Sequence, residues 1–339
     1  RYVLIFDMDS DRGLLDLVNK LLPRNYSLEE LRPTRALCID GFNVSAQSFI
    51  SLPMKDFFQK AEYLDLMHLK GGYKNVIPSM DPQGMNHLIF LKLEYCTEIE
   101  CLVDNSNVDL LQTEDVFSSL VILRLSRLEN LKEVFRYPSS GCSHQSHTSF
   151  MLPKLRTLTI DGCKRLEYIF PVCFATGLVS LEELSIFDCY ELKQIIEEVE
   201  EGSVDYVSSQ SHTSFMLPKL RTLTIVRCDR LEYIFPVCFA AGLVSLEQLD
   251  IIDCRELKQI IKEVEEGSVD YVSSQSHTSF MLPKLRTLRI DGCERLEYIF
   301  PVCFAAGLVS LEDLHIQYCN ALKYDILFLS DLQQDSTAT

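Results

Sequence analysis

The sequence predicts a curved α/β solenoid, in which stacked units each contribute one short parallel strand to a concave face. Three observations predict this fold. A 65-residue block that begins at Met151 begins again at Met216 and, in part, at Met281. Each block contains two copies of a shorter leucine pattern. Within that pattern, apolar and polar residues alternate with a period of two, as they do in a half-buried strand.

The shorter pattern reads L-x-x-L-x-[LI]-x-x-C, as in Leu155, Leu158, Ile160 and Cys163. Further copies start at Leu181, Leu220, Leu246, Leu285 and Leu311, and the frame extends upstream through Leu120, Leu88 and, more loosely, Ala61 and Leu37. A period near 20–29 residues with this signature is typical of leucine-rich repeats, and longer units carry insertions. Amphipathic helices are the alternative, but L-x-x-L-x-L has the wrong period for them. Because one unit cannot bury its own apolar face, the units are expected to stack.

The repeat frame also predicts the organisation of the chain. We expect a partial or degenerate repeat over 1–33, a solenoid of about ten units over 34–324, and a C-terminal tail over 325–339. The two-unit blocks lie at 151–215, 216–280 and 281–324. Pro171, Pro236 and Pro301 interrupt the apolar stretches that follow the strands, so the convex side is predicted to be irregular or built of short helices. The segment from Glu197 to Ser214 is predicted to be an acidic, serine-rich loop.

Cysteine usage indicates a reducing environment. Of thirteen cysteines, six recur in the slot that follows a strand of the three blocks: Cys163, Cys189, Cys228, Cys254, Cys293 and Cys319. Residues that recur in one slot stack in a ladder instead of pairing off. We therefore expect a structural ladder of reduced thiols in an intracellular, cytoplasmic protein.

Charge and hydropathy exclude two classes of partner. The formal net charge is −17, and a surface this acidic repels phosphate backbones and anionic lipids. No apolar run approaches the roughly 20 residues that span a bilayer. Neither nucleic-acid binding nor membrane insertion is expected.

Differences between the copies point to a recognition surface. The two complete blocks differ at nine of 65 positions, and seven of the nine adjoin the predicted strands. The leucine frame and the long loop stay nearly constant, so the concave side chains are the ones that vary. The candidate ligand contacts are Phe187, Asp250, Ile252, Arg289, His315, Gln317 and Tyr318.

The residue that follows the first leucine of each unit alternates in charge. Arg156, Glu182, Arg221, Glu247, Arg286 and Glu312 occupy this position in six successive units. In parallel strands about 4.8 Å apart, these side chains form a row in which opposite charges are neighbours. We expect this row to hold the register of the stack.

The sequence carries no signature of catalysis or of a metal site. It lacks G-x-x-x-x-G-K-[ST], H-E-x-x-H, G-x-S-x-G and C-x-x-C. His144 and His147 lie in a serine-rich segment, whereas a zinc site needs about four converging ligands. We expect neither an enzyme nor a cofactor-binding or metal-binding chain.

Two phrases of the repeat resemble a known family. LPKLRTLTIDGCKRLEYIF and LVSLEELSIFDCYELKQIIEE resemble the C-terminal leucine-rich repeats of plant intracellular immune receptors of the coiled-coil, nucleotide-binding class. This resemblance implies a sensor of a pathogen effector, or of a host protein that an effector has altered. It also implies regulation of the receptor's own nucleotide-binding module, which would hold ADP or ATP upstream of these residues.

Two alternatives remain at this point. A free-standing leucine-rich-repeat adaptor or scaffold would lack the nucleotide switch. An extracellular receptor ectodomain should show flanking cysteine pairs and many glycosylation sequons, and the sequence shows neither pattern. The chain begins with Arg1, so it is expected to be part of a longer protein.

Overall fold

The computed structural model describes residues 3–7, 35–41, 58–104, 106, 116–136, 152–171, 178–197, 217–236, 242–262, 282–300 and 308–323. The chain divides into two compact units, residues 1–164 and residues 165–339. The predicted loop beyond Glu197, the tail over 325–339 and the histidines at 144 and 147 lie outside the described residues. No helix among the described residues is long and apolar enough to cross a membrane.

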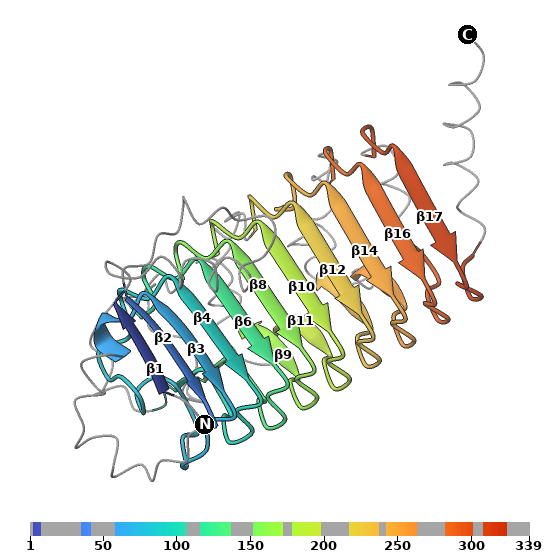
Figure 1. Ribbon diagram of the computed structural model, residues 1–339. Coiled ribbons are helices and arrows are strands. Elements are labelled where there is room, and N and C mark those ends of the chain that lie inside the picture. The colour runs from blue at the N-terminus through green and yellow to red at the C-terminus, as the bar shows by residue number, and fades with distance from the viewer. Residues whose placement is uncertain are drawn as a thin grey trace, which may run out of the picture. The chain divides into compact units, whose positions relative to one another are not determined.

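The first unit contains a sheet whose strands lie in the order β1-β2-β3-β4-β6-β8 (Figure 1). They are β1 (Val3–Asp7), β2 (Arg35–Asp40), β3 (Tyr63–Met67), β4 (Phe90–Glu94), β6 (Ile122–Ser126) and β8 (Thr157–Asp161). Strands β2 to β8 pair in parallel and in register, so Leu64 lies beside Leu91 and Leu91 beside Leu123. Strand β1 instead pairs antiparallel with β2, whereas the repeat pattern predicts parallel strands.

The second unit repeats this arrangement, in the order β10-β12-β14-β16-β17. Its strands are β10 (Glu183–Phe187), β12 (Thr222–Val226), β14 (Gln248–Ile252), β16 (Thr287–Asp291) and β17 (Asp313–Gln317). Every neighbouring pair is parallel and in register. The predicted leucine-rich-repeat solenoid, with one short strand from each unit, is confirmed.

The leucine frame builds the core because a strand alternates its side chains between two faces. In β8, Leu158 and Ile160 are fully buried while Thr159 between them is half-buried. The same holds in β12 for Leu223 and Ile225. Each fully buried leucine or isoleucine contributes about 1.5–3 kcal/mol to the stability of the fold. In β17, the last strand of the described sheet, the frame is only half-buried.

Tight turns lead into the strands. The amide of Leu155 donates to the carbonyl of Leu152 at 3.1 Å, and Leu220 donates to Leu217 at 3.2 Å. Proline follows the first leucine of these turns, at Pro153 and Pro218, where its fixed φ suits the second position of the turn. The L-P-K-L phrase therefore sets the corner at which the chain enters the sheet.

The side opposite the sheet differs from the prediction that it would be irregular or built of short helices. Short strands lie there in two-stranded parallel sheets: β5 (Val103–Asp104) with β7 (Phe135–Arg136), β9 (Tyr168–Pro171) with β11 (Gln194–Glu197), and β13 (Tyr233–Pro236) with β15 (Gln259–Lys262). Pro171 and Pro236 each end a strand of a two-stranded sheet, and such edge strands tolerate a missing amide donor. These prolines thus end short strands and do not prevent them. Pro301 lies outside the described residues.

Candidate functional site

The predicted contact residues of the second unit lie in columns on one face of its sheet. This outer face is the one opposite the buried leucines. The middle column, from the centre of each strand, contains Ser185, Thr224, Asp250, Arg289 and His315. The end column, from the last residue of each strand, contains Phe187, Val226, Ile252, Asp291 and Gln317. Six of the seven predicted contacts fall in these columns, and Tyr318 follows directly.

The end column begins with three apolar side chains. Phe187 lies beside Val226, and Val226 lies beside Ile252, in successive parallel strands. All three are half-buried although they face away from the core. The corresponding positions of the first unit are Asp40, Met67, Glu94, Ser126 and Asp161. This apolar patch, Phe187–Val226–Ile252, is therefore a feature of the second unit.

The middle column is polar and carries both signs of charge. Asp250 lies beside Arg289, which lies beside His315. The side-chain amide of Gln248 donates to Asp250 Oδ2 at 2.7 Å, and the Arg289 guanidinium lies 3.7 Å from Asp291 Oδ2. Charged groups with these partners beside an apolar patch give the surface both burial and directional contacts, the combination that protein interfaces use.

A third column follows the strands and has an unusual backbone. Asp188, Arg227, Asp253, Gly292 and Tyr318 all have φ between 52° and 67°. Such left-handed conformations are uncommon outside glycine. Stacking of the repeats stabilises this backbone conformation. The amides of Asp188, Arg227, Asp253 and Gly292 each donate, at 2.7–3.1 Å, to the carbonyl of the last strand residue in the next repeat. The sequence hints at this column only through Gly162 and Gly292.

Side chains of this left-handed column pair across repeats. The Arg227 guanidinium binds the Asp188 carboxylate through two hydrogen bonds, one of them 2.8 Å long. The Tyr190 hydroxyl also donates to Asp188 Oδ1 at 3.2 Å, and this bond raises the pKa of Tyr190. Tyr318, at the other end of the column, is 75% exposed.

The predicted charge row runs along the strand starts. In the second unit, Glu182, Arg221, Glu247, Arg286 and Glu312 are linked in sequence by backbone hydrogen bonds of 2.8 Å. Arg221 and Glu247 form a two-bond ion pair at 3.0 and 3.1 Å, and Arg286 lies 3.9 Å from Glu312. The bond to Arg221 lowers the pKa of Glu247, and the charge of Arg286 lowers it further.

The cysteine slot faces the core as a column of thiols. Cys163, Cys189, Cys228, Cys254 and Cys293 are fully buried and Cys319 is partly exposed; all are free. Each sulfur lies 3.2–3.8 Å from the carbonyl oxygen of the last residue of its strand, as Cys189 Sγ lies 3.3 Å from that of Phe187. Burial raises the pKa of Cys163 to about 12, so this thiol stays protonated at neutral pH.

The outer face of the first unit differs in a way that sequence reasoning missed. Ala36, Tyr63, Phe90 and Ile122 occupy neighbouring positions at the starts of β2, β3, β4 and β6 and are at most 3% exposed. The rings of Tyr63 and Phe90 stack with centroids 4.3 Å apart. These positions carry Thr, Glu, Gln and Asp in the second unit. The aromatic residues of Y-L-D-L-M and F-L-K-L-E were the available signal.

A buried carboxylate lies next to this apolar cluster. Asp65 is 3% exposed, and its Oδ1 and the hydroxyl of Tyr63 make no hydrogen bond. Lys92 lies 3.8 Å from Asp65 Oδ2 but binds Glu94 more closely, at 2.6 Å. Desolvation therefore dominates and raises the pKa of Asp65. No ligand chemistry is evident for this group, which lies among packed side chains.

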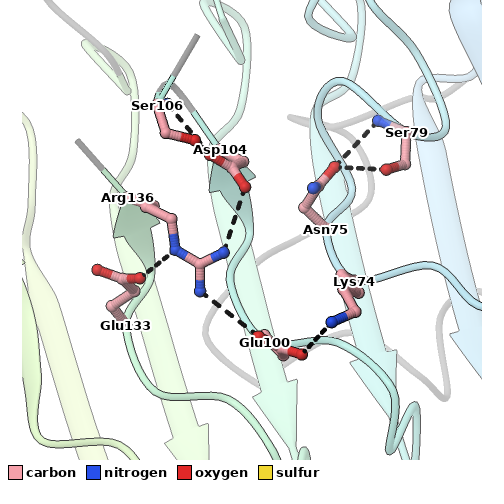
Figure 2. Close-up of polar contacts among 8 residues, drawn as sticks. All are labelled: Lys74, Asn75, Ser79, Glu100, Asp104, Ser106, Glu133 and Arg136. Carbon is pink, nitrogen blue, oxygen red and sulfur yellow. Dashed lines mark hydrogen bonds and ion pairs between the residues drawn. The ribbon is translucent and has the colours of Figure 1, made fainter. Parts of the chain in front are cut away.

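On the opposite side of the first unit, one guanidinium joins three carboxylates. Figure 2 shows Arg136 directed at Glu100, Asp104 and Glu133, with Lys74 on the far side of Glu100. Lys74 lies 3.0 Å from Glu100 Oε1, and this hydrogen bond lowers the pKa of Glu100. Asn75 and Ser79 bond to each other nearby. Since each of these charges already has a partner, this network is a clamp between repeats.

A second alternating charge row runs along this side, and the sequence analysis missed it. One position carries this row: the residue after the next buried apolar side chain beyond the cysteine slot, or after a half-buried leucine in the last repeat. It is Lys74, Glu100 and Lys132 in the first unit, and Glu167, Lys193, Glu232, Lys258, Glu297 and Lys323 in the second. Four neighbouring pairs in this row form ion pairs of 2.7–3.0 Å. Its alternation was visible in the sequence, but only at positions outside the strands.

The described residues contain no group of three or more His, Cys, Asp or Glu side chains that could hold a metal ion. The described residues form a surface: columns of side chains lie on a regular scaffold, with a column of free thiols beneath them.

Comparison with known families identifies the repeat. The family model described as "Plant disease resistance protein RPS2-like, leucine-rich repeats" matches residues 39–190, 203–266 and 267–320. The chain belongs to this family.

Membership of the RPS2-like repeat family confirms the resemblance drawn from the two phrases of the sequence. It supports a protein-interaction role in plant defence. Leucine-rich repeats of this kind are generally not enzymes, in keeping with the absence of catalytic motifs from the sequence. None of the curated proteins matches the chain.

Sixteen chains of solved structures match this RPS2-like repeat chain. One of them, described as "Crystal structure of TLR13-ssRNA13 complex", has 14% identity over 92% of this chain and a TM-score of 0.16. This chain spans 62% of the length of that protein. A likeness at this TM-score supports no argument about ligand or shape.

Proposed function

We propose that the outer face of the second unit binds a protein partner directly, and that this partner is a pathogen effector or a host protein that an effector has altered. The apolar patch Phe187–Val226–Ile252 is the observation that carries the proposal. Three large side chains in register on a solvent-facing column do not contribute to the leucine core. The buried core of a protein interface is apolar and depleted in charged residues, and a patch of this kind suits such a core.

Acidic side chains beside the apolar patch favour a partner that binds in one orientation. Asp250 and Asp253 flank Ile252 in the chain, whereas Arg227 is engaged by Asp188. The surface next to the patch is therefore acidic in net effect, in a chain of net charge −17. A partner that presents an apolar side chain beside lysine or arginine complements it.

Regulation belongs to the same proposal. Binding at this face changes the state of a nucleotide-binding module that holds ADP or ATP in the full-length, cytoplasmic receptor, and this chain itself holds no cofactor. Family membership supports this role. A repeat surface that only tethered two proteins would bind its partner equally well whatever nucleotide the module held.

The test uses the full-length protein as bait against a library of pathogen effectors and host proteins in a two-hybrid screen. Phe187→Asp combined with Ile252→Asp should abolish binding of any direct partner. Lys258→Ala, on the opposite side of the same unit, should leave it intact. If partners tolerate the double substitution but are lost when residues 198–214 are deleted, the recognition face is elsewhere.

A further inference from the structure

The cysteine column ends in a pair of thiols with unequal exposure. Cys293 is fully buried, whereas Cys319, which follows β17, is partly exposed. Strands β16 and β17 are parallel and in register through Asp291 and Gln317, the residues two positions before these cysteines. The proposed recognition function does not use either thiol.

The two thiol groups lie within hydrogen-bonding reach of each other. They occupy the same slot of neighbouring parallel strands, two residues beyond the paired Asp291 and Gln317. Neighbouring strands lie about 4.8 Å apart, and disulfides join Cα atoms separated by about 4.4–6.8 Å. The register of the sheet thus places the pair within the span of a disulfide, with a small movement of the side chains.

Burial disfavours the thiolate form of Cys293 more than that of Cys319, which is partly exposed. The hydrogen bond donated by Cys293 stabilises a thiolate on Cys319 and lowers the pKa of Cys319 to about 7. The same bond and burial raise the pKa of Cys293. A lowered pKa gives Cys319 a larger thiolate fraction than an ordinary thiol has, and thiolate is the reactive form of cysteine.

We propose that Cys293 and Cys319 form an oxidation site, at which a hydroperoxide converts the thiol pair to a disulfide. The Cys319 thiolate attacks the terminal peroxide oxygen, the O–O bond breaks, and the leaving hydroxide or alkoxide takes up a proton. The sulfenic acid so formed on Cys319 reacts with the Cys293 thiol, which loses its proton in the step. The S–S bond replaces the S–O bond and water leaves, so the two thiols lose two electrons to the peroxide.

The same chain contains a matched internal control. Cys228 and Cys254 occupy the same slots one block earlier, are also 26 residues apart, and are also joined by a thiol hydrogen bond. Both are fully buried. If exposure of the leading thiolate controls the chemistry, this pair stays reduced while Cys293 and Cys319 are oxidised.

The test treats the folded chain with hydrogen peroxide and maps disulfides by mass spectrometry. Trypsin places Cys303 and Cys319 in one peptide, 296–323, so the experiment is done in a Cys303→Ser background. The expected product is that peptide linked to 290–295, 2 Da lighter than the sum of the two and released by dithiothreitol. Cys319→Ser should abolish it, and Cys228→Ser should not.

Two results would overturn the inference. One is a folded protein in which peroxide leaves peptides 290–295 and 296–323 unlinked. The other is a Cys228–Cys254 disulfide that forms at the same rate, because exposure would then not govern the reaction. Alkylation of Cys319 by iodoacetamide should also precede that of the buried thiols at pH 7, and uniform labelling would contradict the assigned thiolate.

Discussion

Exchanging the two members of the Arg221–Glu247 ion pair should destabilise the protein, although it preserves the pair. The variant carries Arg221→Glu and Glu247→Arg. In an isolated ion pair such an exchange is nearly neutral. Here the row continues on both sides, because the amide of Arg221 bonds to the carbonyl of Glu182 and that of Arg286 to Glu247. The exchange therefore places two carboxylates together at one end and two guanidinium groups together at the other.

The size of the effect follows from exposure. The side chains of Arg221 and Glu247 are 58% and 34% exposed, so each neighbouring attraction contributes only about 0.2–1 kcal/mol. The exchange keeps one attraction and converts two others into repulsions of similar size. Each of the two neighbours loses an attraction and gains a repulsion, and for side chains this exposed the low end of the range applies. We therefore expect a net loss of about 1 kcal/mol in the free energy of unfolding. Exchanging Arg286 with Glu312, which ends the described row, converts one neighbour only and should cost about half as much.

Urea denaturation followed by circular dichroism measures these differences, at 50 mM and at 1 M NaCl. Since salt screens exposed charges, both exchanged variants should approach the wild-type midpoint at 1 M. An Arg221/Glu247 exchange as stable as the wild-type protein at low salt would refute the row as a continuous structure. A loss that persists unchanged at 1 M NaCl would indicate a packing defect instead.

Three further substitutions test other features. Asp65→Asn should raise the free energy of unfolding at pH 8 by about 1 kcal/mol, since burial makes the charged carboxylate costly. Because the pKa of Asp65 is raised in the folded protein, the advantage of the variant should shrink as the pH falls through that pKa. A stability difference that stays constant across a pH series would contradict the assignment. Gly292→Arg should be tolerated, and the new arginine should pair with Asp253 as Arg227 does with Asp188. The added Cβ would collide with Asp253 Oδ1, so the Asp253 side chain must rotate. A crystal structure of the variant would show the ion pair or its absence. Arg136→Gln should leave three carboxylates without their shared cation and lower the urea midpoint by the equivalent of about 1–2 kcal/mol. The loss should be larger at pH 8 than at pH 4, where the carboxylates begin to protonate. Equal losses at both pH values would argue against the clamp formed by Arg136 between repeats.

The strand frame could be predicted from the sequence because its signal is purely periodic. Leu158 and Ile160 face the core for the same reason that Leu223 and Ile225 do, and no long-range information was needed. The columns of the outer face followed from the same period. Once strands of equal length stack in register, residues at equal positions in the pattern become neighbours, as Asp250 and Arg289 are.

Other features depend on relations that a single repeat does not contain. The left-handed conformation at Arg227 or Tyr318 depends on the stack, which in the case of Arg227 supplies a carbonyl from the next repeat. Burial of Tyr63 and Phe90 on the outer face contradicts the alternation that strands β10, β12, β14 and β16 of the second unit obey. A rule taken from the later repeats therefore misplaces these two residues. Strands at Tyr168–Pro171 were missed because proline was weighed as a breaker, without regard to its position at the strand end.

The two alternating charge rows have a consequence for how such a gene can grow. Unequal crossing-over between copies inserts or removes whole segments of coding sequence. A gain or loss of 65 residues restores the order of charges on both sides of the stack, while a gain or loss of a single unit brings like charges together on both. Selection on the folded protein therefore favours inheritance in pairs of units. The paired blocks at 151–215 and 216–280 are the form in which new columns of outer-face side chains can be copied intact and then diverge.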